Sequence, residues 1–588
     1  MKMQIKRHLI TTSDERTWKL DSPVLFLGEW CRLYDRKQVW SGMDAALVEP
    51  YGLEPKRKER DLAYVQALTG ELLGEVANEL NAFHNTRHSV RYWNIVLGHW
   101  LERYVAITFN RYFTLEHILK NYEISGTTVF DSSDYSLATN DSQAFIWACN
   151  DDVWNHVLYA KILNFLGYER IEKDSVHLQG ISGFVQEENT KAAPGLNFKP
   201  LILNAANYIL HKFSRKSDAF IISSYLPLIE EVKLQLSLGQ CPQAWRSPVL
   251  KTVAPDQESR RRFSLDGGTY AGYEQFVRNQ LGECIPTCFL EGYTKMVRQS
   301  ESLPWPADPK FIFTSNNYDT DEIFKVWSGS KAEKGVPYIV GQHGNYQAVR
   351  GSSNWPERMT CDKFIAWGGL NENSWDVPAF VFKIANQPRE TKPDGGLLLI
   401  ELCMPHRLTL GDAYYEFGIY QEQQFRFVEA LPEKIQNELT VRLHGAWRNF
   451  RWSEDRRWSD RMPSVHLETG KANIQTLIAK SRLVVHSYDS TGILEGLASN
   501  VPTLGFWDGG LDHLLPRDKP YYELLRGAGI LADSPEQAAL FVTQYWDDID
   551  GWWKSEQVQS ARRVFCEQYA RNEKNPIRTM KQLLAQLY

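Results

Sequence analysis

Short apolar runs alternate with stretches of helical periodicity throughout the last third of the chain. Brief runs rich in Val, Leu and Ile are typical of buried β-strands. The predicted strands cover residues 397–402, 440–443, 465–467, 483–485, 502–507 and 529–532. Apolar residues at helical spacing predict helices over 413–438, 474–481, 493–500 and 521–527. Strands that alternate with helices in this way predict a parallel, doubly wound sheet.

The first two thirds of the chain show the same alternation, with longer helices. Apolar runs predict strands at 22–28, 126–131, 219–223, 310–314, 336–340 and 364–367. Helical periodicity predicts helices over 56–80, 89–120, 141–166, 228–238 and 270–299. The last of these is expected to break at Pro286, because proline removes a backbone donor. The aromatic residues of 89–120 are expected to pack between helices, and residues 170–215 are predicted to be an insertion or a long loop.

A segment rich in proline, glycine and charge, NQPRETKPDGG at 386–396, indicates a linker. It divides the chain into a predicted N-terminal Rossmann-like domain with helical insertions, 1–388, and a predicted C-terminal Rossmann-like domain, 389–588. The terminal helices of the second domain are long enough to cross back to the first. The expected fold class is α/β, with two Rossmann-like domains and an enlarged, helix-rich N-terminal half.

The stretch 482–507, RLVVHSYDSTGILEGLASNVPTLGFW, combines a strand, a polar turn, a helix start and a second strand. A helix start offers free backbone N–H groups and about half a positive charge, which favours an anion such as a phosphate. The sequence therefore predicts a phosphate site at this turn. Its polar and flexible residues are His486, Ser487, Tyr488, Asp489, Ser490, Thr491 and Gly492.

Polar residues near the ends of other predicted elements are candidate catalytic groups. Glu29 follows strand 22–28, Asp131 ends strand 126–131, and His343 lies between two glycines after strand 336–340. The carboxyl ends of strands face the ligand crevice in open α/β sheets, so these side chains are expected near a ligand. Asp152, in the polar group DDVWNH, is the fourth candidate. The alternative for that group is a capped helix start, with Asn150 or Asp151 as the N-cap.

Composition narrows the classes of function. The net charge of -6 gives no support for a nucleic-acid partner. No apolar run approaches the roughly 18 to 20 residues of a membrane span, and the N-terminus lacks the apolar core of a signal peptide, so a cytoplasmic location is expected. The eight cysteines are scattered, which predicts reduced thiols and no zinc site. No metal and no cofactor are expected.

One acidic motif formally matches the Asp-x-Asp pattern of metal-dependent sugar transferases. It consists of Asp319, Thr320 and Asp321. We interpret it differently, because a helix is predicted to start near Asp321 and acidic residues favour the first turn of a helix. Asp319 or Thr320 is therefore expected to be the N-cap of that helix.

The order of VHLETG, NIQTLIAKSRLVVHS and DSTGILEGLASNVPTLGF resembles the donor-binding half of GT-B glycosyltransferases. In those enzymes a Glu on the helix commonly holds the nucleotide ribose, and the turn before it meets the phosphate. The resemblance implies the first role for Glu495 and the second for the turn at 486–492. The chain from FLGEWC through RYWNIVLGHWL, GQHG and HSYDSTG also resembles a family of transferases associated with O-antigen gene clusters.

A narrower resemblance concerns transferases that use CMP-linked acid sugars, such as Kdo transferases and bacterial sialyltransferases. Several of these pair a Ser/Thr-rich phosphate turn with a His-containing loop, which implies that role for His406 or His444. A Kdo transferase family places a catalytic Glu in a Gly-Glu loop, which implies that role for Glu29. The expected donor-binding residues are Arg442, His444, His486, Ser487, Asp489, Ser490, Thr491, Gly492, Glu495 and His406.

The resulting hypothesis is a metal-independent GT-B glycosyltransferase. It would move a sugar from a nucleotide-activated donor, such as CMP-Kdo or a related acid sugar, to a lipopolysaccharide O-antigen or other surface polysaccharide. A CDP-polyol phosphotransferase, a nucleotide-sugar epimerase and a non-catalytic glycan-assembly protein are the alternatives. A lipid-linked acceptor implies a peripheral contact with the inner membrane. The segment around Trp552 and Trp553 is then either an interfacial helix or a helix packed on the N-terminal half.

Overall fold

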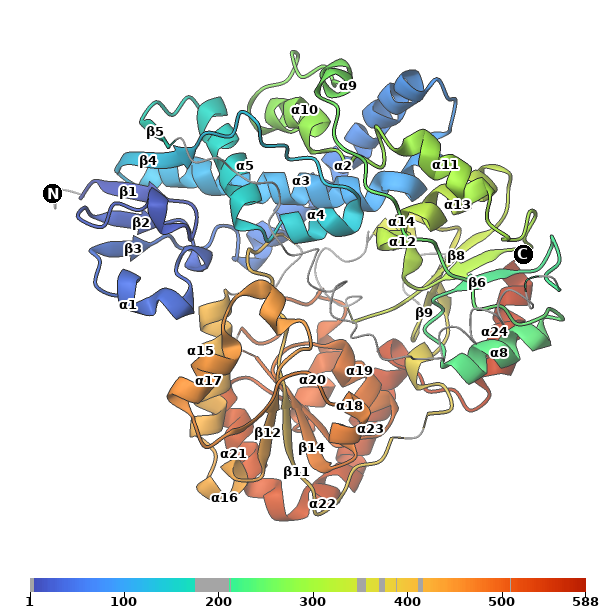
Figure 1. Ribbon diagram of the computed structural model, residues 1–588. Helices are drawn as coiled ribbons and strands as arrows, with labels where there is room; N and C mark the ends of the chain where they lie inside the picture. Colours follow the sequence, from blue (N-terminus) through green and yellow to red (C-terminus); the bar gives the residue numbers. More distant parts are fainter. Residues whose placement is uncertain are drawn as a thin grey trace, which may run out of the picture.

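The computed structural model describes residues 5–174, 211, 213–345, 356–369, 376–387, 389–410, 416–507 and 509–587. Within these ranges the strands form three separate sheets, with helices between and around them (Figure 1). Neighbouring strands pair in parallel throughout these three sheets. The α/β class is thereby confirmed, since parallel strands need the crossover connections that helices supply.

The first sheet has the strand order β3-β2-β1-β4-β5. Its strands are β1 (Arg7–Ile10), β2 (Val24–Phe26), β3 (Ala45–Leu47), β4 (Ile124–Phe130) and β5 (Ile171–Asp174). The predicted strands at 22–28 and 126–131 are confirmed as β2 and β4. The prediction of a loop from residue 170 is wrong for β5, whose sequence IEKD has no apolar run because the strand lies at the edge of the sheet.

The second sheet has the order β10-β9-β8-β7-β6. Its strands are β6 (Phe220–Ile222), β7 (Ile312–Thr314), β8 (Tyr338–Gly341), β9 (Lys363–Ala366) and β10 (Asp376–Pro378). All but β10 were expected from the apolar runs. Successive side chains enter different cores, since Phe220 and Ile222 belong to the core shared with the first sheet, whereas Ile221 belongs to the core shared with the third. The second sheet therefore connects the other two.

Long helices fill the space between the first two sheets. They are α2 (Pro55–His84) and α3 (Val90–Asn121), and α3 contacts α2, α5 (Asp152–Phe165) and α13 (Glu322–Glu333). The aromatic stripe of α3 is buried, as expected for helix packing. The other helices of this part are α1 (Lys37–Trp40), α4 (Ser142–Ala148), α8 (Leu228–Ser237), α9 (Gln257–Arg262), α10 (Gly272–Cys284), α11 (Tyr293–Glu301), α12 (Asn317–Thr320) and α14 (Pro356–Thr360).

Three of the predicted helices are each divided in the structure. The stretch 413–438 contains α15 (Phe417–Glu429) and α16 (Glu433–Gln436). The stretch 141–166 forms α4 and α5, and Asp151 caps α5 by accepting a hydrogen bond from the Trp154 N–H at 2.8 Å. The stretch 270–299 forms α10 and α11 on either side of Pro286, as predicted. The fold class is unaffected by these breaks.

The third sheet is doubly wound, with the order β13-β12-β11-β14-β15-β16. Its strands are β11 (Gly396–Ile400), β12 (Leu439–Arg442), β13 (His466–Glu468), β14 (Ser481–His486), β15 (Thr503–Phe506) and β16 (Leu531–Ala532). The strand order reverses between β11 and β14, and such a reversal opens a ligand crevice at the carboxyl ends of the strands. Its helices are α15 (Phe417–Glu429), α16 (Glu433–Gln436), α17 (Glu454–Arg461), α18 (Ile474–Ile478), α19 (Thr491–Ala498), α20 (Lys519–Gly527), α21 (Pro535–Tyr545), α22 (Ile549–Lys554), α23 (Glu556–Tyr569) and α24 (Pro576–Leu587).

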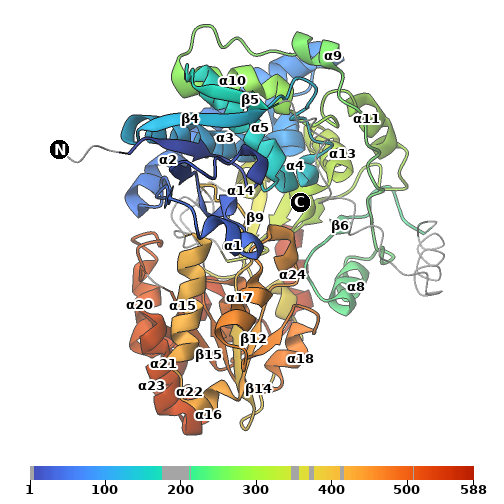
Figure 2. The same ribbon diagram turned by 60° about the vertical axis from the view of Figure 1, so that its left-hand side comes forward.

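The last helices cross back to the second sheet. α24 packs on α8, and the backbone of Arg571 exchanges hydrogen bonds with Trp367 and Val381 at 2.7 and 2.9 Å. A Cβ at Gly368 would lie 2.2 Å from the carbonyl oxygen of Gln568, so this close crossing requires glycine. In Figures 1 and 2 the first sheet lies above the third from both directions, and in Figure 1 α24 lies beside α8.

The tryptophans of α22 are buried, and their surroundings match neither the interfacial helix nor the packing on the N-terminal half that was expected of that segment. Trp552 and Trp553 are 7% and 3% exposed, and their indole N–H groups donate to Ala528 and Asn500. They pack in the core of the third sheet and form no aromatic surface for a bilayer. No helix in the described ranges is long and apolar enough to cross a membrane.

Candidate functional site

The turn between β14 and α19 begins the candidate site. Ser490 is the N-cap of α19, because its Oγ accepts a hydrogen bond from the Ile493 N–H at 3.2 Å. The same hydroxyl lies 3.1 Å from Nδ1 of His486, a buried residue whose pKa burial lowers to about 3. The next two backbone N–H groups, those of Thr491 and Gly492, have no acceptor among the described residues. The helix start therefore keeps two free donors.

The loop after β8 meets this turn from the second sheet. The backbone N–H of Asn345 donates to Oγ1 of Thr491 at 3.0 Å, and its side-chain amide donates to Oδ1 of Asp489 at 2.7 Å. The carboxyl ends of the second and third sheets therefore face each other here. Sequence reasoning predicted the turn and the loop separately, but it missed Asn345, which joins them.

Asp489 anchors the turn within the third sheet. Its Oδ2 lies 3.1 Å from Nε2 of His513 and accepts a hydrogen bond from the Tyr522 hydroxyl at 3.0 Å. With the amide of Asn345 on Oδ1, both carboxylate oxygens have protein partners. The carboxylate thus fixes the position of the turn, and the ligand-binding capacity lies with the backbone N–H groups beside it.

His343 lies in the β8 loop and is held by an aromatic neighbour. Its Nδ1 is 2.7 Å from the hydroxyl of Tyr318, whose ring stacks on His99 at 4.9 Å between centroids. Burial, together with the positive charge of Lys383, lowers the pKa of His343 to about 4, so the imidazole is neutral at pH 7. When the Nδ1–H donates to Tyr318, the neutral imidazole carries its lone pair on Nε2.

Glu495, one turn into α19, has two basic partners. Its carboxylate pairs with Arg389 at 2.8 Å and with Lys383 at 3.6 Å. A cavity of ≈ 50 Å³ beside it is lined by Arg389, His486 and Gly492, among others. Sequence reasoning missed both cations. Arg389 lies in the segment interpreted as a linker, where charge usually indicates exposure to solvent, and only the structure places it on Glu495.

Glu29 lies at a different place, where the first sheet meets α15. Its Oε2 accepts a hydrogen bond from the Gly418 N–H at 2.7 Å, at the N-terminus of that helix. The favourable dipole of the helix start explains a carboxylate there. Burial and the neighbouring charge of Glu29 raise the pKa of Glu416 to about 8. Glu29 thus connects two parts of the chain, at a point separate from His343.

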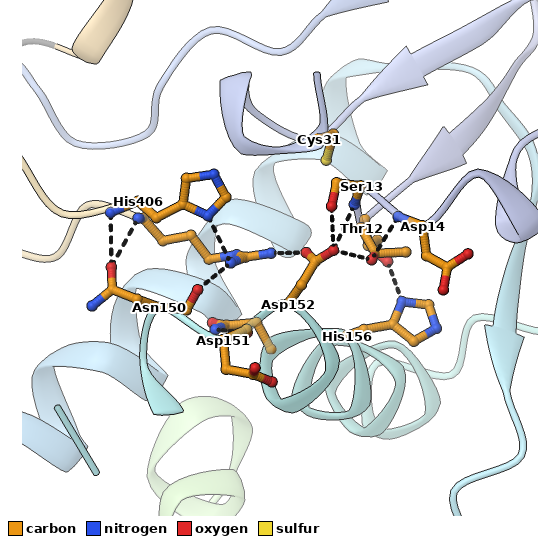
Figure 3. A network of polar contacts seen from close by, with 12 residues as sticks. Thr12, Ser13, Asp14, Cys31, Asn150, Asp151, Asp152, His156 and His406 are labelled. Atoms are coloured by element: carbon orange, nitrogen blue, oxygen red, sulfur yellow. Dashed lines mark hydrogen bonds and ion pairs between the residues drawn. The ribbon is translucent and has the colours of Figure 1, made fainter. Parts of the chain in front are cut away.

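Asp152 is the centre of a buried polar network between the first and third sheets, which Figure 3 shows. It forms an ion pair with Arg407, and its Oδ2 accepts hydrogen bonds from Thr12 at 2.7 Å and from the Ser13 hydroxyl at 2.6 Å. Burial disfavours its charge, but Arg407 and the two hydroxyls outweigh burial and lower its pKa to about 2. The carboxylate is ionised and fully engaged.

His406 belongs to the same network and not to the phosphate turn. Its backbone N–H donates to Oδ1 of Asn150 at 2.8 Å, and the Arg407 guanidinium donates to the Asn150 carbonyl at 2.9 Å. The imidazole of His406 is buried against Trp452, and burial lowers its pKa well below the usual value. Arg407 is a residue that sequence reasoning missed, although it lies in the short segment that follows a predicted strand end, and this position was a signal.

The remaining predicted residues lie apart from α19. Arg442, at the end of β12, donates to the Leu443 carbonyl at 3.0 Å and lies 3.6 Å from Glu468. His444 is exposed and accepts a hydrogen bond from the Ala446 N–H at 3.2 Å. Asp131 is exposed at the end of β4. Ser487 lies 2.8 Å from the hydroxyl of Tyr420, beside the strand-order reversal of the third sheet.

The acidic motif at 319–321 lies at a helix start, as predicted, but the prediction of Asp319 or Thr320 as the N-cap is wrong. Asp321 is the N-cap of α13, because it accepts a hydrogen bond from the Phe324 N–H at 3.0 Å. Asp319 pairs instead with Arg103 at 3.0 Å. Within the described ranges, no three His, Cys, Asp or Glu side chains are grouped closely enough to hold a metal ion.

The fold and the site define a class of protein. Two parallel sheets face each other through their carboxyl ends, a helix start with two free backbone N–H groups lies between them, and the C-terminal helices cross back. This is a GT-B-like arrangement, extended here by the first sheet. A family model for LIC12162 family transferases matches residues 7–584, and the chain belongs to that family.

Solved structures resemble parts of the chain. MurG from Acinetobacter baumannii has 10% identity, a TM-score of 0.31, and coverage of 63% of this chain and 99% of its own. The glycosyltransferase SnogD from Streptomyces nogalater has 14% identity, a TM-score of 0.32, and coverage of 63% of this chain and 100% of its own. MnaA from S. aureus, solved with UDP, has 14% identity, a TM-score of 0.31, and coverage of 50% of this chain and 79% of its own. These scores are too low to support an argument about function, and no curated protein matches the sequence.

Proposed function

We propose that this chain transfers a sugar from a nucleotide-activated donor to a saccharide acceptor, with the donor phosphate at the start of α19. The observation that carries the proposal is the pair of free N–H groups of Thr491 and Gly492, opposite the β8 loop. A leaving nucleotide is an anion, and donors aimed at developing charge are among the largest contributions to catalysis. Lys383 and Arg389 add two cations one turn along the helix.

Glu495 has a specific part in this proposal. The ion pair with Arg389 occupies its carboxylate in the structure. When a donor binds, the ribose hydroxyls replace Arg389 on Glu495, and the released guanidinium turns to the phosphate. Such an exchange costs little, because each group leaves one charged or polar partner for another. It also explains why a basic residue of the linker lies against the helix.

Proton transfer is assigned to His343. The imidazole is neutral at pH 7, and its Nδ1 is held by Tyr318. Its loop contacts the turn at 486–492, here called the donor turn, through Asn345. In the proposed step Nε2 accepts the proton of the acceptor hydroxyl as that oxygen bonds to the anomeric carbon, and the bond from this carbon to the donor phosphate breaks. Glu29, Asp131 and Asp152 lie at other places, so the proposal gives them no part in this step.

The finer assignment follows the resemblances. The donor is a CMP-linked acid sugar such as CMP-Kdo or another nucleotide sugar, and the acceptor is a surface polysaccharide such as an O-antigen, built at the cytoplasmic face of the inner membrane. Membership of a transferase family supports group transfer in general. The proposed step uses no metal, so chelation with EDTA is expected to leave transfer unchanged.

The test is a thermal-shift screen with CMP-, UDP-, GDP-, dTDP- and CDP-linked donors, followed by product analysis. One donor is expected to raise the melting temperature of the wild type. His343→Ala should keep that shift but lower the transfer rate by about 10²–10⁴-fold, the range for loss of a general base. His466→Ala, which removes an exposed histidine of β13, is the matched control and should transfer normally.

Four outcomes would contradict the proposal. Stabilisation by none of the donors would remove the donor site. Conversion of the donor to an isomer without an acceptor would indicate an epimerase, and a phosphodiester product would indicate a polyol phosphotransferase. Normal transfer by His343→Ala would remove the assigned base and leave the donor site intact.

A further inference from the structure

A second pocket opens in the first sheet, away from the residues of the donor turn. It has a volume of ≈ 340 Å³ and is formed by segments 129–137, 160–164 and 257–283 together with Lys173 of β5. This volume is at the lower end of the range for small-molecule sites. Residues at the carboxyl ends of β4 and β5 line it, and open α/β sheets bind ligands beyond the carboxyl ends of their strands. We call it the first-sheet pocket.

Hydroxyl and amide groups form much of its lining. Ser132, Ser133 and Ser136 lie in the loop after β4, and Asn164 lies on α5. Tyr135 also lines the pocket, and its side chain is only 9% exposed. These groups can both donate and accept hydrogen bonds, which suits a ligand with several hydroxyl groups.

The hydroxyl of Tyr135 is an independent sign of a ligand. It is buried, and it has no hydrogen-bond partner among the described residues. A buried polar group without a partner costs roughly 1–3 kcal/mol, so such groups are uncommon and usually meet water or a ligand. A ligand hydroxyl in the pocket would satisfy the phenol.

Two of the three basic side chains that line the pocket form ion pairs with carboxylates, and within the described residues the third does not. Lys161 pairs with Glu283 at 2.6 Å, and the buried Arg260 pairs with Glu291 at 2.8 Å. Lys173 is exposed at the end of β5 and has no carboxylate partner among the described residues. One cation of the pocket is therefore available for an anionic group.

Asp131 supplies the complementary chemistry. Its Oδ1 accepts a hydrogen bond from the Ser133 N–H at 3.2 Å, and the carboxylate remains exposed to the pocket. A carboxylate accepts hydrogen bonds only, so it can bind neighbouring hydroxyls of a sugar but not an anion. The pocket thus offers an acceptor of hydroxyl groups, Asp131, and a cation, Lys173.

We propose that the first-sheet pocket binds a monosaccharide that carries one anionic group, either a carboxylate or a phosphate. The sugar hydroxyls bind Asp131 and Tyr135, and the anionic group binds Lys173. No residue of the third sheet lines this pocket. Binding here is therefore independent of the donor site, and its outcome can be separated from that of the proposed transfer.

The test is isothermal titration calorimetry of the full chain with glucuronate, glucose 6-phosphate, glucose and inorganic phosphate. Binding of at least one of the two anionic sugars is expected, and the tighter of them identifies the anionic group. Glucose should bind at least about tenfold more weakly, since a hydrogen bond to a charged group is worth about that factor or more. Inorganic phosphate alone should show no comparable affinity.

Variants locate the site. Lys173→Gln should weaken the anionic sugar about tenfold or more and leave glucose unchanged. Asp131→Asn and Tyr135→Phe should weaken both sugars. Tyr135→Phe should melt no lower than the wild type, because it removes a buried hydroxyl without a partner. Lys334→Gln, an exposed lysine after α13, is the matched control and should bind like the wild type.

Three results would overturn the proposal. The first is no binding by either anionic sugar, with the chain folded. The second is equal affinity for inorganic phosphate and the sugar phosphate, which would indicate a plain anion site. The third is binding that survives both Lys173→Gln and Asp131→Asn. Ser490→Ala should leave this binding unchanged whether or not the chain transfers sugar.

Discussion

Two of the contacts between the N-terminal part of the chain and the third sheet, here called junctions, differ in character. At the first junction Arg407 is buried among residues of the first sheet and forms an ion pair with Asp152. At the second junction the loop of the second sheet contacts the donor turn through the amide of Asn345. The first is charged and buried, whereas the second is made by a few hydrogen bonds at a partly exposed edge.

The difference has an energetic meaning. Removing one partner of a buried ion pair typically costs about 3–5 kcal/mol, because the other charge is left uncompensated. A neutral hydrogen bond contributes only about 0.5–1.5 kcal/mol. A ligand can therefore enter the second junction without disturbing the first. The first junction helps to hold the two halves together, alongside the core that the second and third sheets share. The loop of the second sheet forms the adaptable wall of the candidate site.

The largest expected effect comes from breaking the first junction. Arg407→Met should lower the free energy of unfolding by about 3–5 kcal/mol, because Asp152 then keeps its charge without its cation. Urea denaturation measures this loss. Lys434→Met removes an exposed cation from the surface pair with Asp547 and is the control with little expected change.

A double variant makes this test sharper. Arg407→Met combined with Asp152→Asn should recover part of the loss, since the uncompensated carboxylate is gone. If the double variant loses as much stability as the two single variants together, the two side chains have no coupling free energy. The first junction would then be held by packing alone.

The second expected effect is a fall in the free energy of unfolding at low pH. The folded pKa of Asp152 is about 2, below its ordinary value of 3.8. A depressed carboxyl pKa contributes stability above the unfolded pKa and loses it as the pH falls through the folded pKa. This contribution, on the order of 2 kcal/mol, should disappear between about pH 4 and pH 2. The difference in stability between wild type and Asp152→Asn should therefore shrink over that range, and a constant difference would contradict the assignment.

The same two junctions show what sequence can and cannot predict. Apolar runs located most strands, and the polar turn at 486–492 and the loop around His343 were each recognised from residue type and position. Strand β5, with sequence IEKD, and strand β10 lack an apolar run, so periodicity could not reveal them. Pattern along the chain also contains no strand order, so it could not show that the residues before the linker form two sheets.

The partners of the predicted residues were even harder to predict from the sequence. Asp152 was selected because it is polar and lies near an element end, and His406 because a resemblance implies a role for it. The structure places both in one buried network. Such a network looks like a site in sequence because it needs the same residue types. Conversely, Arg389 looks like linker charge, and only its position 2.8 Å from Glu495 gives it a role.

The smallest expected effect tests the second junction. Asn345→Ala removes the hydrogen bond from the side-chain amide to Asp489 but keeps the hydrogen bond from the backbone N–H to Thr491. The free energy of unfolding should therefore fall by only about 0.5–1.5 kcal/mol. Asp489 keeps His513 and Tyr522 as partners, so the turn should stay in place. The losses of Asn345→Ala and Arg407→Met should add, because the two junctions share no residue. A loss as large as that of Arg407→Met would show that the second junction also holds the halves together, and the site would then lack the adaptable wall on which donor exchange at Glu495 depends.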